Sequence, residues 1–163
     1  MKIFVYHGGT DCVEKPLCHI GRPNLDFGQG FYLTEMKEQA ISWAKFLAGR
    51  RERTPIVNIY QLDKSAILAE ARCKIFKEYD EEWLNFIARS RKGLNPAADY
   101  DYIEGGIAND RVIDTINLYI AGLMSIEVAL NRLAQHRPNN QICLLNQDLT
   151  DKFLIYERSE HVE

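Results

Sequence analysis

The sequence predicts an α+β domain with a largely antiparallel arrangement of strands, and three observations lead to this expectation. The 163 residues are 46% hydrophobic and 26% charged, which is the balance of a folded globular chain. Strand-like and helix-like apolar patterns are mixed along the chain without the regular alternation of a doubly wound parallel sheet. The length suits one domain over residues 1–163 and is too short for two ordinary ones.

The amino-terminal part predicts two strands, a long loop and a helix. Residues 2–7 are rich in β-branched and aromatic side chains and predict a strand that ends at two glycines. Residues 10–29 carry Pro and Gly without a sustained period, so we expect a long loop of the kind that is often functional. Residues 30–34 predict a short apolar strand, and residues 37–48 have the apolar spacing of a helix.

The rest of the chain predicts further strands and helices in mixed order. A helix after residue 108 is expected to be capped by Asn109 or Asp110 and closed by Gly122, and a later one to begin at Ser125 and stop before Pro138. The remaining predicted elements are strands at residues 56–62, 100–108, 141–145 and 153–156, and a helix at residues 80–91.

Charge and hydropathy exclude several classes of protein. Twenty Lys and Arg against 23 Asp and Glu give a net charge of −3, which is not the charge of a dedicated nucleic-acid binder. The apolar runs are only a few residues long, and the amino terminus has no apolar core of signal-peptide length. We therefore expect a cytoplasmic protein without membrane contact.

The four cysteines predict reduced thiols and no metal site. Cys12, Cys18, Cys73 and Cys143 form no CxxC pair, and nothing indicates secretion. Cys12 and Cys18 lie near His19, but a zinc site usually has tighter pairs and a fourth donor. Inert thiols are the expectation.

Three polar or glycine-rich segments carry groups that a pure core does not need. Tyr6-His7-Gly8-Gly9-Thr10 ends the first strand, where glycines allow a ligand to approach the backbone. Gly28-Gln29-Gly30-Phe31-Tyr32 joins pliable backbone to two aromatic rings. Asn139-Asn140-Gln141 opens a late apolar strand with an amide that donates and accepts hydrogen bonds. Each segment also has a structural interpretation: a turn, a loop entering a core strand, and an exposed strand start.

In this order and spacing the segments resemble the ADP-ribosyltransferase superfamily. The closer likeness is to the branch of poly(ADP-ribose) polymerases and diphtheria-type toxins, which is marked by a His-Tyr-Glu triad. That branch has His-Gly on its first strand, Gly-x-Gly-aliphatic-Tyr, a helix with a second aromatic residue, and a late strand opened by Asn-Glu. The matching positions here are His7-Gly8, Gly28-Gln29-Gly30-Phe31-Tyr32, Trp43 and Asn140-Gln141. The chain is also similar to an uncharacterised bacterial family of small toxin-like proteins.

The resemblance implies two packed, mainly antiparallel sheets with flanking helices and a central cleft for NAD, which is the co-substrate. His7 would hydrogen-bond the adenine-side ribose, and the Gly8 backbone would bind the nicotinamide carboxamide. Tyr32 and Trp43 would sandwich the nicotinamide ring, a contact that contributes on the order of 1 kcal/mol beyond burial. Gly9, Gly28, Gly30 and Phe31 complete this implied cofactor-binding set, and no metal is needed.

The implied reaction breaks the bond between nicotinamide and ribose through an oxocarbenium-like state. The chain has Gln141 where the branch has a Glu, so the missing negative charge is expected from Asp110, unless Asp110 only caps a helix. A helix start at Asn109, with Arg111 or Arg22, would favour the pyrophosphate. Ala40 stands where the branch usually has a Ser that binds the carboxamide.

The expected function is mono-ADP-ribosylation of a protein or nucleic-acid acceptor, because a neutral Gln141 does not suit polymer elongation. The expected role is that of a bacterial toxin or defence effector with a cognate antitoxin. Three alternatives stay open: an enzyme like the RNA 2′-phosphotransferases, a non-catalytic module that binds NAD or ADP-ribose, and an interaction domain without an NAD site.

Overall fold

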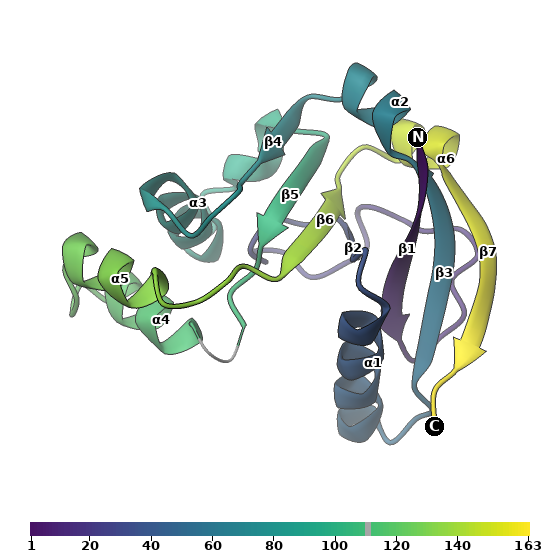
Figure 1. Cartoon of the computed structure of the whole chain (residues 1–163), viewed down its shortest axis with the longest axis horizontal. Helices are drawn as coiled ribbons and strands as arrows, with labels where there is room; N and C mark the ends of the chain where they lie inside the picture. Colours follow the sequence, from purple (N-terminus) through teal and green to yellow (C-terminus); the bar gives the residue numbers. More distant parts are fainter. Residues whose placement is uncertain (110–111) are drawn as a thin grey trace.

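The computed structural model describes residues 1–109 and 112–163 (Figure 1). Within these residues there are seven strands, six α-helices and one short 3₁₀ helix. The strands form a three-stranded and a four-stranded sheet. The α+β class and the two mostly antiparallel sheets are therefore confirmed. No helix in this described part has the length and hydropathy needed for a bilayer crossing.

The three-stranded sheet has the order β1-β3-β7, and every pair in it is antiparallel. Its strands are β1 (Lys2–Gly9), β3 (Ile56–Asp63) and β7 (Leu154–His161). The four-stranded sheet has the order β2-β6-β5-β4, in which only β4 and β5 run parallel. Its strands are β2 (Phe31–Leu33), β4 (Cys73–Ile75), β5 (Tyr102–Gly106) and β6 (Asn140–Leu144).

The two sheets meet along β1 and β2. Tyr6 and Thr34 exchange both backbone hydrogen bonds, with N···O distances of 2.8 and 3.0 Å. Behind this bridge the inner faces of the two sheets pack into one apolar core, because alternate residues of each strand point to the same side. The three-stranded sheet contributes Val5, Tyr60 and Leu62, and the four-stranded sheet contributes Phe31, Leu33, Tyr102, Ile142 and Leu144.

Helices cover the two outer faces (Figure 1). Helix α1 (Lys37–Arg51) lies on the three-stranded sheet, where Ala40 and Ala44 pack against Val57 and Ile59. Helices α3 (Glu81–Arg91), α4 (Ile113–Ile120) and α5 (Ile126–Leu133) cover the four-stranded sheet. Their buried side chains pack around Ile103 and Cys143 of β5 and β6. In Figure 1 the start of β6 therefore lies between α1 on one side and the α4–α5 pair on the other.

Most predicted elements are confirmed, and one predicted helix start is wrong. Asn109 does not occupy the cap position of α4: the helix begins at Ile113, and Val112 is the cap residue. The prediction for Asp110 lies outside the described residues. The Asn109 carbonyl accepts from the amides of Val112 and Ile113. Four short elements were not predicted: α2 (Lys64–Glu70), β4, the 3₁₀ helix η1 (Pro96–Asp99) and α6 (Gln147–Phe153).

Candidate functional site

Strand register places Tyr32 and Gln141 on one outer face of the four-stranded sheet. Tyr32 pairs directly with Cys143, and Leu33 pairs with Ile142. Side chains two residues apart share a face, so Gln141 lies on the same face as Cys143 and Tyr32. Tyr32 and Gln141 are then diagonal neighbours, which in antiparallel pairs are separated by about 7–8 Å. Two of the three residues predicted as a triad are thus brought together.

The same outer face continues onto β1. The Tyr6–Thr34 bridge is antiparallel, so its register sets Gly8 opposite Tyr32. Gly8 therefore shares the outer face with Tyr32 and Gln141. A side chain does not fit at Gly8, because a Cβ there would clash with the Ala40 carbonyl of α1. The sequence requires glycine here because the helix packs directly on the strand.

The strands β1 and β2 separate just after the bridge. A continued ladder would next join Gly8 and Tyr32 by two backbone hydrogen bonds. No such bond joins these two residues, and the Tyr32 carbonyl instead accepts from His7 Nδ1 at 2.8 Å. The N–H and C=O of Gly8 point to the same edge as those of Tyr6, which is the edge where β2 departs. A carboxamide has the complementary donor and acceptor for such an edge.

We call the place just after the Tyr6–Thr34 bridge, where β1 and β2 separate, the seam. His7 lies at the seam, although its position on β1 belongs to the opposite face of the strand. Its ring is half-buried and stacks on Phe31, with ring centroids 4.4 Å apart and an interplanar angle of 24°. Because a carbonyl oxygen only accepts, Nδ1 carries the proton and Nε2 keeps a lone pair. Burial lowers the pKa of His7, and the hydrogen bond to the Tyr32 carbonyl opposes this only in part. At neutral pH Nε2 is an acceptor.

Tyr32 supplies a ring face and no titratable group. Its hydroxyl donates to the Gly28 carbonyl at 2.7 Å and accepts from the Phe27 amide at 3.0 Å. Burial, followed by the neighbouring Cys143 and Asp26, raises the pKa of Tyr32 far above its ordinary value. The turn that holds the hydroxyl needs glycine, since Gly28 has a φ of 86°. The phenol is locked in place and stays neutral.

Gln141 is a half-buried amide that directly follows two fixed asparagines. Among the described residues its side chain makes no hydrogen bond. By contrast, Asn139 Oδ1 accepts from the Ile107 amide at 3.2 Å, and Asn140 Nδ2 donates to Glu104 Oε2 at 2.8 Å. The strand start is therefore held while the Gln141 amide stays available to a ligand. It can donate and accept hydrogen bonds, but it carries no charge.

The predicted pairing of Trp43 with Tyr32 is not present. Trp43 is 52% exposed and stacks on Phe46, with centroids 5.3 Å apart. No ring contact joins it to Tyr32 within the described part of the chain. The residues of α1 that face Gly8 are Ala40 and Ala44, which are buried, whereas Trp43 is half-exposed. Ala40 itself reaches Gly8 through its backbone.

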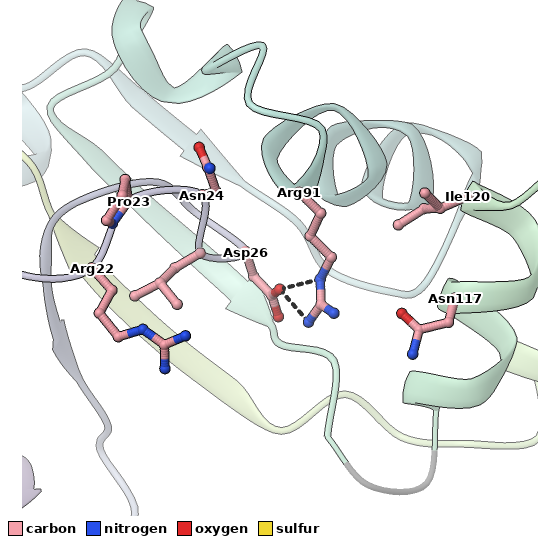
Figure 2. A pocket seen from close by; sticks show the side chains of 8 residues that line it. Arg22, Pro23, Asn24, Asp26, Arg91, Asn117 and Ile120 are labelled. Carbon is pink, nitrogen blue, oxygen red and sulfur yellow. Dashed lines mark hydrogen bonds and ion pairs between the residues drawn. The ribbon is translucent and has the colours of Figure 1, made fainter.

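An open cavity of about 560 Å³ lies between the loop before β2 and helices α3 and α4 (Figure 2). Figure 2 shows Arg22, Asn117 and Ile120 around the ion pair of Asp26 and Arg91, whose N···O distances are 2.7 and 3.0 Å. Asp26 also accepts from the Ala108 amide at 2.7 Å. Arg22 forms no ion pair with another described residue. Within the described part of the chain, the predicted Arg22 thus lines the cavity without a carboxylate partner, whereas Asp26 and Arg91 were not predicted.

The remaining predicted residues have different positions. Gly9 lies beside the His7 ring, since a Cβ there would be 3.8 Å from Nε2. Gly30 packs against Cys143 and Leu145 and leaves no space for a side chain. The Asn109 carbonyl accepts from the first amides at the start of α4, those of Val112 and Ile113. The predictions for Asp110 and Arg111 lie outside the described residues.

A family model described as a protein of unknown function (DUF3990) matches residues 3–154. The match runs from β1 to the first residue of β7, so it includes the seam, the cavity and all of β6. Neither the curated proteins nor the solved structures contain a match to the chain.

Proposed function

We propose that this chain, which belongs to the DUF3990 family, is a mono-ADP-ribosyltransferase with NAD as its co-substrate. The observation that carries the proposal is the strand register at the seam. It places the Gly8 backbone, the Tyr32 ring and the Gln141 amide on one face where β1 and β2 separate. In this proposal the fold is of the ADP-ribosyltransferase type, and the outer face between α1 and α4 is its NAD cleft.

Each group at the seam has a complementary group on NAD. The Gly8 N–H and C=O would form hydrogen bonds with the carboxamide of the nicotinamide. The nicotinamide ring would stack on the Tyr32 ring. The Gln141 amide would hold a hydroxyl of the adjoining ribose. His7 Nε2 would accept a hydrogen bond from a hydroxyl of the adenine-side ribose, since Nδ1 already donates to the Tyr32 carbonyl. Arg22, which has no ion pair with a described residue, would bind the pyrophosphate from the cavity.

The proposed reaction breaks the C–N bond between ribose and nicotinamide. The bonding electrons leave with the nicotinamide, and the ribose carbon becomes an oxocarbenium-like centre. A nucleophile of the acceptor then gives this carbon an electron pair and loses a proton to solvent. Gln141 orients the ribose without stabilising its charge, which suits transfer of a single unit better than rapid polymer growth. The chain's own contribution is mainly orientation, which is a large source of rate enhancement.

The test is transfer of labelled ADP-ribose from NAD to a cell lysate, together with release of nicotinamide. Gln141→Ala should abolish both signals or reduce them at least about tenfold, because one ribose contact of about 1.4 kcal/mol corresponds to that factor. The matched control is Gln61→Ala, which removes another half-buried strand glutamine. Among the described residues its side chain bonds Glu157 of β7, in the three-stranded sheet. Equal activity of both variants and the parent chain would refute the role of Gln141.

A non-catalytic module that binds NAD or ADP-ribose is the second candidate function. The observation that favours it is the neutral Gln141, since no charge for the oxocarbenium centre comes from this position. The same experiment separates the two functions. A binding module is stabilised by NAD against thermal unfolding but releases no nicotinamide, whereas the enzyme does both.

A further inference from the structure

A charged network lies directly behind the start of β6, on the inner face of the sheet. Glu104 of β5 has a side chain only 11% exposed, and both of its oxygens are used. Lys64 Nζ lies 3.2 Å from Glu104 Oε1, and Asn140 Nδ2 donates to Oε2 at 2.8 Å. The Tyr102 hydroxyl also donates to Glu104. None of these residues is part of the proposed NAD-binding set.

The same network reaches the end of β2. Lys64 Nζ also lies 3.2 Å from Glu35 Oε2, and Glu35 follows Tyr32 by three residues. Burial favours the neutral form of Lys64, but the carboxylates of Glu104 and Glu35 outweigh it and raise the pKa of Lys64 above its ordinary value. Lys64 therefore stays protonated and links Glu35, which follows β2, to Glu104 of β5, and Glu104 in turn bonds Asn140 of β6.

The backbone ladder that holds the start of β6 comes from β5, where Gly105 pairs with Gln141 and Gly106 with Asn140, and not from β2. The pairing of β2 with β6 consists of three residue pairs and ends at Leu33 and Ile142. Gln141 lies one position beyond that ladder. One weak contact continues it, because the Thr34 hydroxyl lies 3.5 Å from the Asn140 carbonyl. Beyond the three pairs of that ladder, side-chain contacts such as the bridge of Lys64 between Glu35 and Glu104 hold β2 to the β5–β6 pair, and so help to set Tyr32 against Gln141.

Stability alone does not account for the network. Taking an ion pair out of water costs several kcal/mol per ion, and well-packed apolar residues often serve folding as well or better. Buried polar groups are more useful where they fix one geometry among several similar ones. Here the fixed geometry is the relation between two strands that carry the proposed site.

We propose that Glu104, held by Lys64, is a positioning residue that fixes Asn140 and thereby sets Gln141 against Tyr32. The proposal rests on the proposed function for its catalytic consequence. Its structural part, that Glu104 holds the start of β6, is independent of NAD. Glu104 touches no proposed substrate group and acts only through Asn140.

The experiment compares Glu104→Gln and Asn140→Ala with a matched control, Asp101→Asn. Asp101 is also a β5-side carboxylate with an 11% exposed side chain, and it also bonds a cation and an Asn amide, those of Arg72 and Asn146. It lies at the opposite end of β5 from the residue that pairs with Gln141. Asn140→Ala leaves the ion pair intact, which gives a second route to the same contact if Glu104→Gln folds poorly.

Two measurements are made on each variant: amide hydrogen exchange over residues 137–144 and the kinetics of nicotinamide release. Glu104→Gln and Asn140→Ala should speed exchange at the start of β6 and lower kcat by on the order of ten- to a hundredfold, with KM for NAD nearly unchanged. Asp101→Asn should leave kcat and that exchange as in the parent chain, even where it lowers the melting temperature.

Three outcomes overturn the positioning role. They are unchanged exchange at the start of β6, unchanged kcat in an active protein, and a loss of kcat by Asp101→Asn equal to that of Glu104→Gln. If the parent chain neither binds NAD nor releases nicotinamide, the proposed function fails by itself. The exchange data then still support or overturn the role of Glu104 at Gln141.

Discussion

The two aromatic residues predicted to enclose the nicotinamide are held in different ways. Tyr32 is fixed by two hydrogen bonds from its hydroxyl and by the register of β2. Trp43 is fixed by neither, since it is half-exposed on α1 and rests on Phe46. A strand residue alternates in a known way, whereas the direction of a helix residue depends on how the helix is rotated on its sheet. For this reason the direction of the Tyr32 side chain can be predicted from the sequence more reliably than that of Trp43.

At His7 the structure predicts a pH dependence of stability. The folded state keeps the ring neutral, and burial sets its pKa below the ordinary value of 6.5. Between that lowered pKa and 6.5 the unfolded chain binds more protons than the folded one, so the free energy of unfolding rises with pH. The stabilisation is complete above pH 6.5 and is lost as the pH falls through the folded-state pKa. Urea unfolding between pH 7.5 and 5 measures it.

The control for His7 is His7→Gln, whose side-chain amide can still donate to the Tyr32 carbonyl but does not titrate in this range. The parent chain should lose stability relative to this variant as the pH falls below 6.5. The other histidines are common to both proteins and cancel in the difference. Parallel stability curves would contradict the neutral, buried state of His7.

At the scale of elements, the contact between β1 and α1 depends on one missing side chain. Gly8→Ala should force α1 away from the strand, because the new Cβ would meet the Ala40 carbonyl. Overpacking of this kind costs about 1–3 kcal/mol of unfolding free energy. Gly49 of α1 is the control, since a Cβ there meets no atom within 4 Å. Gly49→Ala should stabilise the protein by about 0.4–1 kcal/mol.

Urea unfolding of both variants measures these changes. A Gly8→Ala chain as stable as the parent would show that α1 does not press on the strand. In that case the close approach of α1 to Gly8 would be refuted, and the carboxamide contact proposed at Gly8 would lose its structural support.

The longer elements were predictable and the short ones were not. Strands β1 and β3 and helices α1 and α3 carry enough apolar residues for a period to be recognised. Helices α2 and α6 have only seven residues each, and β4 has three. Their starts did carry a signal, because Asp63 and Asn146 cap the two helices with their side chains. The signal is too common to be used without a periodic segment behind it.

The candidate site was predictable as a set of residue types and not as a geometry. Glycine pairs and aromatic residues singled out Gly8 and Tyr32, but their opposition follows from the register of two strands that meet at one bridge. No sequence pattern indicated a role for Glu104, because its partners Lys64 and Asn140 come from distant segments of the chain. Contacts of this kind depend on how the sheets are joined, which no local pattern contains.

At the scale of the whole molecule, the proposed site is shared by the two sheets. Gly8 belongs to the three-stranded sheet, whereas Tyr32 and Gln141 belong to the four-stranded sheet. The sheets are joined along β1 and β2 by the Tyr6–Thr34 bridge and the His7–Tyr32 hydrogen bond, and at the inner face by the apolar core. A ligand that contacts all three residues would add a further connection between the sheets. Binding should therefore stabilise the whole fold and not only a loop.

This gives a prediction for thermal unfolding with NAD. A ligand at a hundred times its Kd stabilises the folded state by about 2.7 kcal/mol. For a chain of this size each kcal/mol raises Tm by about 2–4 °C, so the shift should be about 5–11 °C. Gln141→Ala and Tyr32→Ala should reduce it, and Gln61→Ala should not. A shift that persists in full in both site variants would place the NAD site elsewhere on the protein, and a shift absent from the parent chain would leave the seam without its proposed ligand.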